Sequence, residues 1–200
     1  MTTEPTEHLL RTAEPGERFH PHTIPLYLVD RLVQVYKPTV FIETGTYLGF
    51  TVEAVVDKFE CVFTVEVDQR LAQAARWKFA ADERVRVVNA DSREALKQVL
   101  ADERVVHHRA LIWLDAHWSG GVTGGQDGEV HTAVRDELLA IQQSGRRDDI
   151  IMVDDIDDFD GRHGYPTDAE LIYELLQVNP SYEVARLPIR RGVVIALPPR

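Results

Sequence analysis

The fold class of this chain is decided by the stretch Val40-Phe41-Ile42-Glu43-Thr44-Gly45-Thr46-Tyr47-Leu48-Gly49. Its apolar start is typical of a buried strand, and the glycine-containing turn after it predicts that the strand passes into a helix. Gly45 lets the backbone turn sharply and approach a ligand closely, and Gly49 lets the following helix start close to the strand. The stretch therefore predicts the first unit of a nucleotide-binding α/β fold.

The spacing of this turn narrows the kind of ligand. It reads Glu-x-Gly-x-x-x-Gly, whereas a dinucleotide pyrophosphate is bound by Gly-x-Gly-x-x-Gly. A carboxylate at the strand end repels phosphate and attracts an ammonium group, which favours an adenosyl amino acid over NAD. The residues expected to bind the cofactor here are Glu43, Gly45, Thr46 and Gly49. The same pattern also arises by chance where a strand meets a helix, so the turn alone leaves both interpretations open.

Two further apolar runs end in polar residues and are spaced like successive βαβ units. The second run ends at Glu66, where a carboxylate would meet the two ribose hydroxyls of an adenosine, and Asp68 is the better candidate to cap the next helix. The third run ends at Asp91 and Ser92, where polar groups could bind an adenine edge. A cofactor site explains three neighbouring strands that end in polar residues better than three chance occurrences of the pattern do.

The whole pattern resembles the class I S-adenosylmethionine-dependent methyltransferases over residues 39–198. The runs Ala110–Trp118 and Ile150–Asp155 narrow the resemblance to divalent-metal-dependent O-methyltransferases of the catechol and macrocin types. In those families, the aspartate ending strand four and an Asp-Asp or Asp-Asn pair ending strand five hold a magnesium ion. The resemblance implies S-adenosylmethionine as cofactor, Asp115 beside it, and magnesium ligands at Asp115, Asp154 and Asp155.

The chemistry of three aspartates agrees with a bound cation. Magnesium prefers hard oxygen ligands and keeps several waters, so a few carboxylates and two substrate oxygens suit it. Without a cation the carboxylates would repel one another, and a bound metal would also lower the pKa of a coordinated hydroxyl. Asp154 and Asp155 are adjacent, so the strand must already have turned into a loop there. The alternative is that both belong to a solvated acidic loop.

His117 is the candidate general base, because a histidine near neutral pKa can take the proton of a substrate hydroxyl. A contact to the cofactor or to the metal shell is the alternative role. The catechol-type enzymes place a lysine shortly after the metal aspartate, and this chain has Trp118-Ser119-Gly120-Gly121 there, so that assignment does not carry over.

Five glycines within residues 119–128 predict a loop over the site. Glu137 either faces the pocket or only begins the next helix.

Composition is that of one compact domain. The chain has 200 residues, of which 44% are hydrophobic. No run is long enough to span a bilayer and the N-terminus lacks a signal-peptide pattern, so a cytoplasmic protein without membrane contact is predicted. The net charge of -11 argues against a nucleic-acid substrate, because such affinity comes largely from lysine and arginine. A small molecule is the predicted partner.

Residues 1–23 are polar and proline-punctuated, and they are predicted to be a flexible arm or lid before a single domain at 24–200. Helices are expected near residues 24–36, 52–59, 69–80, 93–100, 130–143 and 169–178, and strands near 40, 62, 85, 111, 151, 182–187 and 193–197. This alternation predicts an α/β, Rossmann-like doubly wound sheet. The hairpin at the end matches the antiparallel last strand of the methyltransferase fold. The leading helix and the hairpin are candidate homodimer surfaces.

Two functions follow from this pattern. One is a magnesium-dependent methyltransferase that acts on a hydroxyl of a small molecule, such as a sugar or a secondary metabolite. The other is a non-catalytic domain that binds an adenosyl ligand or a metal for sensing or assembly. The fold does not decide between them. The three aspartates at strand ends favour the enzyme, because a pure binding module has no reason to keep them there.

Overall fold

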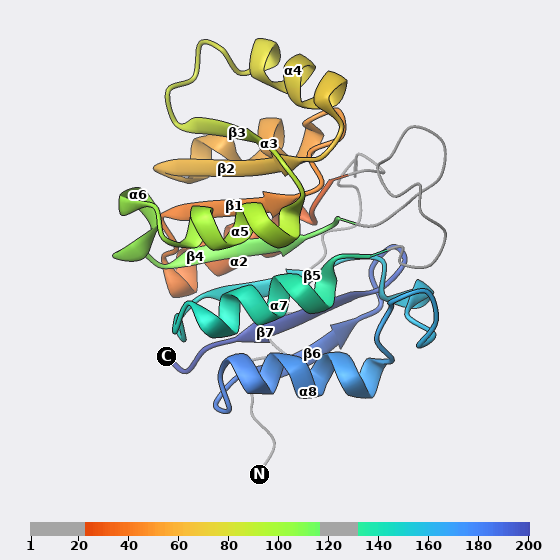
Figure 1. Cartoon of the computed structure of the whole chain (residues 1–200). Helices are drawn as coiled ribbons and strands as arrows, with labels where there is room; N and C mark the ends of the chain where they lie inside the picture. Colours follow the sequence, from red (N-terminus) through yellow and green to blue (C-terminus); the bar gives the residue numbers. More distant parts are fainter. Residues whose placement is uncertain (1–22, 117–131) are drawn as a thin grey trace.

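The structure is a computed structural model, and it describes residues 23–116 and 132–200. These residues form a single sheet with helices on both of its faces (Figure 1). The predictions for the arm at residues 1–22, for His117 and for the glycine-rich loop lie outside the described residues. None of the described helices is long and apolar enough to cross a membrane.

The sheet has seven strands: β1 (Val40–Thr44), β2 (Cys61–Glu66), β3 (Val85–Asn89), β4 (Ala110–Leu114), β5 (Ile150–Val153), β6 (Glu183–Leu187) and β7 (Val193–Leu197). The α-helices are α2 (Leu26–Tyr36), α3 (Phe50–Val55), α4 (Gln69–Lys78), α5 (Ser92–Leu100), α6 (Glu103–Val106), α7 (Val134–Gln143) and α8 (Asp168–Val178). Two 3-10 turns, η1 (Val56–Lys58) and η2 (Ile156–Asp158), follow α3 and β5.

The strands lie in the order β3-β2-β1-β4-β5-β7-β6. The pairs among β1 to β5 are parallel, and β7 runs antiparallel to both β5 and β6. This confirms the predicted doubly wound sheet with an antiparallel C-terminal strand. The chain leaves β1 towards β3 and then returns to β4 on the other side of β1. Ligands of open α/β sheets bind at such a reversal, outside the carboxyl ends of the strands.

Strand register brings the predicted site residues to one edge of the sheet. Thr44 pairs with Leu114 across β1 and β4, and Leu114 pairs with Val153 across β4 and β5. The residues that directly follow these three are therefore neighbours at the carboxyl edge: Gly45, Asp115 and Asp154. Asp154 and Asp155 come after the last residue of β5, as the sequence predicts for an adjacent pair that leaves the strand.

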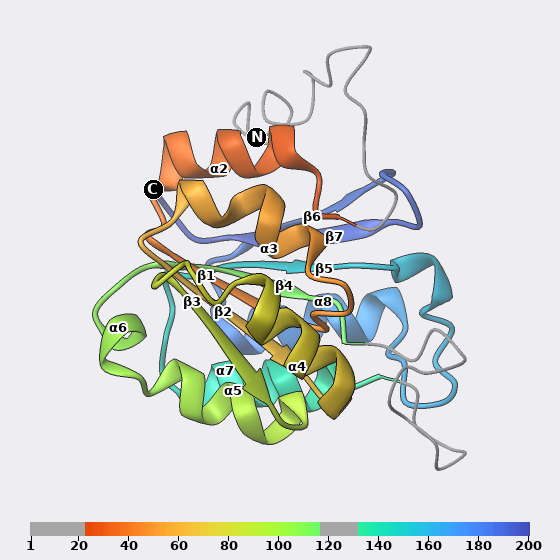
Figure 2. The same cartoon turned by 90° about the horizontal axis from the view of Figure 1, so that it is seen from above.

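The core has two layers because successive strand residues point to opposite faces. On one face, Ile42 of β1 belongs to a buried cluster that includes residues of α5, α7 and α8. On the other face, Phe41 belongs to a cluster that includes residues of α2 and α3. Figure 2 shows these two groups of helices on opposite sides of the sheet. Full burial of each such side chain contributes about 1.5–3 kcal/mol, so the layers fix the strand ends where the site forms.

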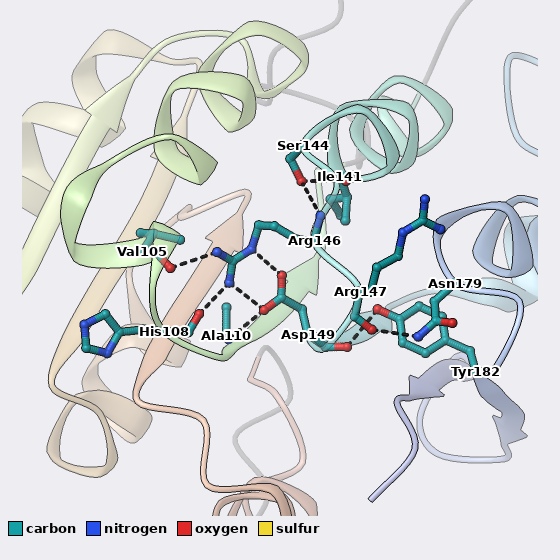
Figure 3. A network of polar contacts seen from close by, with 10 residues as sticks. All are labelled: Val105, His108, Ala110, Ile141, Ser144, Arg146, Arg147, Asp149, Asn179 and Tyr182. Atoms are coloured by element: carbon teal, nitrogen blue, oxygen red, sulfur yellow. Dashed lines mark hydrogen bonds and ion pairs between the residues drawn. The ribbon is translucent and has the colours of Figure 1, made fainter.

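A polar network joins the amino ends of β4 and β5, at the opposite edge of the sheet (Figure 3). The Arg146 guanidinium donates to the Asp149 carboxylate through Nε at 2.5 Å and Nη2 at 2.6 Å. It also donates to the backbone carbonyl oxygens of Val105 and His108, at 2.8 Å and 2.6 Å. Asp149 accepts the backbone N–H of Ala110 at 2.8 Å. The network holds α6, β4 and β5 together, far from the candidate site.

Candidate functional site

The turn after β1 lies directly against the turn after β4. Gly45 has φ +88°, and a Cβ added there would lie 2.5 Å from the backbone carbonyl oxygen of Asp115. The Gly45 N–H donates to the Val65 carbonyl oxygen at 2.9 Å. Glycine is therefore required by a backbone contact within the protein. The sequence pattern predicts that a ligand uses the space left by the missing Cβ, whereas in the structure the backbone of Asp115 occupies that space.

Replacing Gly45 with alanine is expected to lower the free energy of unfolding by more than the roughly 1–2 kcal/mol that a left-handed backbone costs a residue with a Cβ. The extra loss comes from the contact with Asp115. Gly145 provides a matched control, since its φ is +74° and an added Cβ would meet nothing within 4 Å. Urea unfolding of Gly45→Ala and Gly145→Ala measures the difference. Equal losses in the two variants would show that the contact has no effect.

Glu66 lies beside this turn and links it to the end of β2. Its Oε2 accepts the backbone N–H of Tyr47 at 2.8 Å, and its Oε1 accepts the N–H of Asp68 at 2.9 Å. Each carboxylate oxygen can accept a further hydrogen bond, so both retain capacity for a hydroxyl. Asp68 caps α4, as predicted, because its side chain accepts the N–H groups of Arg70 and Leu71. The predicted contact of Glu66 with a ribose stays a prediction.

Glu43 points into the protein interior. The Thr64 hydroxyl donates to its Oε2 at 2.6 Å, and the hydroxyls of Thr64 and Thr46 are 2.5 Å apart. Burial raises the pKa of the Glu43 carboxyl to about 8, and the negative charge of Asp115 adds to the rise. Glu43 is therefore a neutral acid at pH 7. A neutral acid does not attract an ammonium group by charge, so the geometry removes the electrostatic reason for the predicted role.

The remaining predicted cofactor residues occupy helix starts. Gly49 is the N-cap residue of α3 with φ 70°, and a Cβ there would lie 2.8 Å from the Phe79 ring. Asp91 caps α5 by accepting the N–H of Arg93 at 3.0 Å, and it forms an ion pair with the Arg93 side chain. Ser92 is the first residue of α5 and is buried. These residues stand after the carboxyl ends of β1 and β3, where a nucleoside is expected.

A small pocket opens between the ends of β4 and β5. Its lining combines apolar side chains, among them Val153 and Phe159, with three acids: Asp115, Glu137 and Asp154. The indole N–H of Trp113 donates to Asp115 Oδ2 at 3.3 Å, and the Asp115 N–H donates to Thr44 Oγ1, also at 3.3 Å. Asp115 is thus fixed by two neighbouring strands.

Asp154 is buried with an unsatisfied oxygen. Its Oδ1 has no hydrogen-bond partner in the part of the chain that the structure describes, and its Oδ2 lies 3.4 Å from Arg190 Nη1. Burial raises the pKa of the Asp154 carboxyl to about 7, and the charge of Asp115 raises it further, while Arg190 opposes the rise. An unsatisfied buried oxygen costs free energy unless a ligand, ion or water supplies a partner.

Asp155 has different surroundings from Asp154, and the predicted triad of Asp115, Asp154 and Asp155 stays a prediction. Its backbone is left-handed, with φ 55°, and its Oδ2 lies 3.6 Å from Arg191 Nη1 on the turn between β6 and β7. Within residues 23–116 and 132–200, no group of three or more His, Cys, Asp and Glu side chains is arranged to hold a metal ion. Asp115 and Asp154 nevertheless line the same pocket. Two carboxylates fit magnesium, which is commonly held by one or two of them together with waters.

No protein-family model matches the sequence, and no curated protein matches it either. Solved structures do match. The S-adenosylhomocysteine-bound methyltransferase PaMTH1 of Podospora anserina is similar with a TM-score of 0.58 and 18% identity, over 98% of this chain and 87% of that chain. The O-methyltransferase TomG of Streptomyces achromogenes, involved in tomaymycin synthesis and solved with S-adenosylmethionine, is also similar. Its TM-score is 0.60 and its identity 14%, over 86% of this chain and 78% of that chain.

This chain has the class I methyltransferase fold. The resemblance found in the sequence is thereby confirmed for the fold. In this fold, the pocket between β4 and β5 adjoins the reversal of strand order at β1, and Glu66 stands on the other side of that reversal. Sequence reasoning missed the arginines Arg190 and Arg191 as partners of the aspartate pair, and it left the orientation of Glu137 open.

Proposed function

We propose that this chain is an S-adenosylmethionine-dependent methyltransferase that acts on a hydroxyl of a small molecule. The observation that carries the proposal is the position of Glu66, a buried carboxylate at the end of β2 that is hydrogen-bonded to the glycine-containing turn. A carboxylate at this place suits the two ribose hydroxyls of the adenosyl group. The turn after β1 then faces the methionyl part, and the start of α5 faces the adenine.

Methyl transfer is an in-line displacement. The acceptor oxygen forms a bond to the methyl carbon, the bond from that carbon to sulfur breaks, and the electron pair stays on sulfur to give S-adenosylhomocysteine. The hydroxyl proton must pass to a base, for which His117 remains the candidate. The protein contributes mainly by holding donor and acceptor in line, which accounts for a large part of the rate of such reactions. The fixed positions of Glu66 at the end of β2 and of Asp115 after β4, on the two sides of β1, supply that geometry.

A divalent cation such as magnesium is part of this proposal, with Asp115 and Asp154 as the residues that would hold it. When bound, it would lower the pKa of a coordinated acceptor hydroxyl. The fit rests on the unsatisfied Oδ1 of Asp154 and on the shared pocket. Asp155 pairs with Arg191 and is not needed as a ligand of a cation that keeps several waters.

A small acceptor is supported by charge. The net charge of -11 disfavours a phosphate backbone as substrate. The second candidate, a non-catalytic domain that binds the same adenosyl ligand, has the same cofactor contacts. The carboxylates of the pocket favour the enzyme, because binding of the adenosyl group alone makes no use of them.

The proposal predicts that Glu66→Gln binds S-adenosylhomocysteine roughly 10–100 times more weakly than the wild type. A hydrogen bond to a charged group contributes about 1.5–3 kcal/mol, and the substitution removes that charge while keeping the shape. Isothermal titration calorimetry measures the affinity. Glu60→Gln is the control, since Glu60 is exposed and lies just before the other end of β2. Unchanged affinity in Glu66→Gln would remove Glu66 from the cofactor site.

A further inference from the structure

We propose that Glu137, rather than Asp155, is the third carboxylate of the cation site formed with Asp115 and Asp154. The site would take a hard divalent cation, Mg²⁺ or Mn²⁺. The inference rests on the proposed function, because Glu137 would add a third ligand to the cation site that the proposed function places in the same pocket. It assigns a ligand from helix α7, whereas the sequence pattern placed all three ligands at strand ends.

The position of Glu137 carries the first step. It lies in the first turn of α7, is 1% exposed, and lines the same pocket as the two aspartates. Its Oε1 is buried and has no hydrogen-bond partner among residues 23–116 and 132–200. A buried carboxylate oxygen without a partner is costly, so its retention in a pocket indicates a ligand that supplies the partner.

Two hydroxyl groups lie near the Glu137 carboxyl, those of Ser92 at the start of α5 and Thr44 at the end of β1. Asp154 resembles Glu137 in having one buried carboxylate oxygen, Oδ1, without a hydrogen-bond partner among the described residues, while its Oδ2 lies beside Arg190. A single cation would satisfy both oxygens.

The donor set decides the class of ligand. The acids of the pocket, Asp115, Glu137 and Asp154, offer only oxygen, which suits magnesium and manganese and does not favour softer metals that prefer nitrogen or sulfur. Among the described residues the three carboxylates share the pocket without forming a ready coordination group, so they must draw together to hold one cation. Asp155 does not line this pocket and lies beside Arg191.

The test is binding of Mn²⁺ alone, followed by electron paramagnetic resonance and by calorimetry at pH 8. Glu137→Gln keeps the shape of the side chain and is expected to weaken Mn²⁺ binding at least roughly tenfold, since even residues that only support metal ligands change affinity 10–100-fold. Asp155→Asn is expected to have a much smaller effect on Mn²⁺ affinity, because Asp155 does not line the pocket and lies beside Arg191. Asp136→Asn, an exposed acid on the same turn of α7, is the charge-matched control and is expected to bind like the wild type.

Equal Mn²⁺ affinity in the wild type and Glu137→Gln would overturn the assignment, and so would a loss in Asp155→Asn alone. Glu137→Asp keeps the negative charge but shortens the side chain by one methylene, so this variant is also expected to bind Mn²⁺ more weakly than the wild type. If Glu137→Gln does not fold, Glu137→Asp is used in its place. Absence of Mn²⁺ binding in the wild type would also refute the inference. Titration of S-adenosylhomocysteine into the same wild-type sample then shows separately whether the methyltransferase proposal stands.

Discussion

Replacing Asp149 with alanine is expected to lower the free energy of unfolding by about 3–5 kcal/mol, because it leaves the Arg146 guanidinium without its carboxylate in a largely buried place. The side chain of Asp149 is 1% exposed and that of Arg146 is 11% exposed. The substitution also leaves the backbone N–H of Ala110 without its acceptor (Figure 3). Urea denaturation followed by circular dichroism measures the change.

Asp148→Ala provides the control for this prediction. Asp148 is adjacent and exposed, and its loss is expected to change the stability by no more than about 0.5 kcal/mol. The network lies at the amino edge of the sheet, so folded Asp149→Ala is expected to bind S-adenosylhomocysteine like the wild type. A destabilisation below about 1 kcal/mol would mean that the buried pair contributes no more than a surface pair.

The second large effect is a dependence of stability on pH that Glu43→Gln removes. The folded protein keeps the Glu43 proton up to about pH 8, whereas the unfolded chain loses it near pH 4.5. The native state therefore binds more protons between these values, and its free energy of unfolding falls as the pH rises from 4.5 to 8. Glutamine stays neutral and keeps the carbonyl oxygen that accepts from Thr64. We expect Glu43→Gln to gain stability over the wild type by a few kcal/mol across this range.

The measurement is a series of urea unfolding curves for both proteins between pH 5 and pH 9. Glu137 and Asp154 also have raised pKa values, but they are present in both proteins and cancel in the difference. Glu60→Gln, an exposed acid, is expected to follow the wild type. Parallel wild-type and Glu43→Gln curves would show that the buried carboxyl is ionised at neutral pH and that an ammonium-binding role is open again.

The sheet could be predicted from the sequence because each of its signals is local. Apolar runs of strand length alternate with helical patterns, and this alternation alone indicates a mostly parallel sheet. The hairpin signal at Arg190-Arg191-Gly192 predicted the last two strands, which the structure confirms as β6 and β7. Helix α6 was missed because its four residues are too few to show a period. The 3-10 turn η2 was missed for the same reason, whereas η1 lies within the helix predicted near residues 52–59.

The candidate site was only partly predictable, because the directions of its side chains depend on distant contacts. Residues that follow strands could be placed at one edge, since parallel register fixes that edge. The left-handed backbone of Asp155 and its neighbour Arg191 could not be predicted, because nothing in the local pattern links residues 36 positions apart. Glu137 gave no signal beyond an acid in the first turn of a helix, where acids are common.

A crystal structure with S-adenosylhomocysteine tests the central claim most directly, namely that this chain uses the carboxyl edge of β1, β2 and β4 to bind an adenosyl cofactor. We predict density for the ligand along that edge, with the two ribose hydroxyls within hydrogen-bond distance of the Glu66 carboxylate and the sulfur facing the pocket of Asp115 and Asp154. Crystals grown or soaked at millimolar ligand that show it bound elsewhere, or not bound, would contradict the claim.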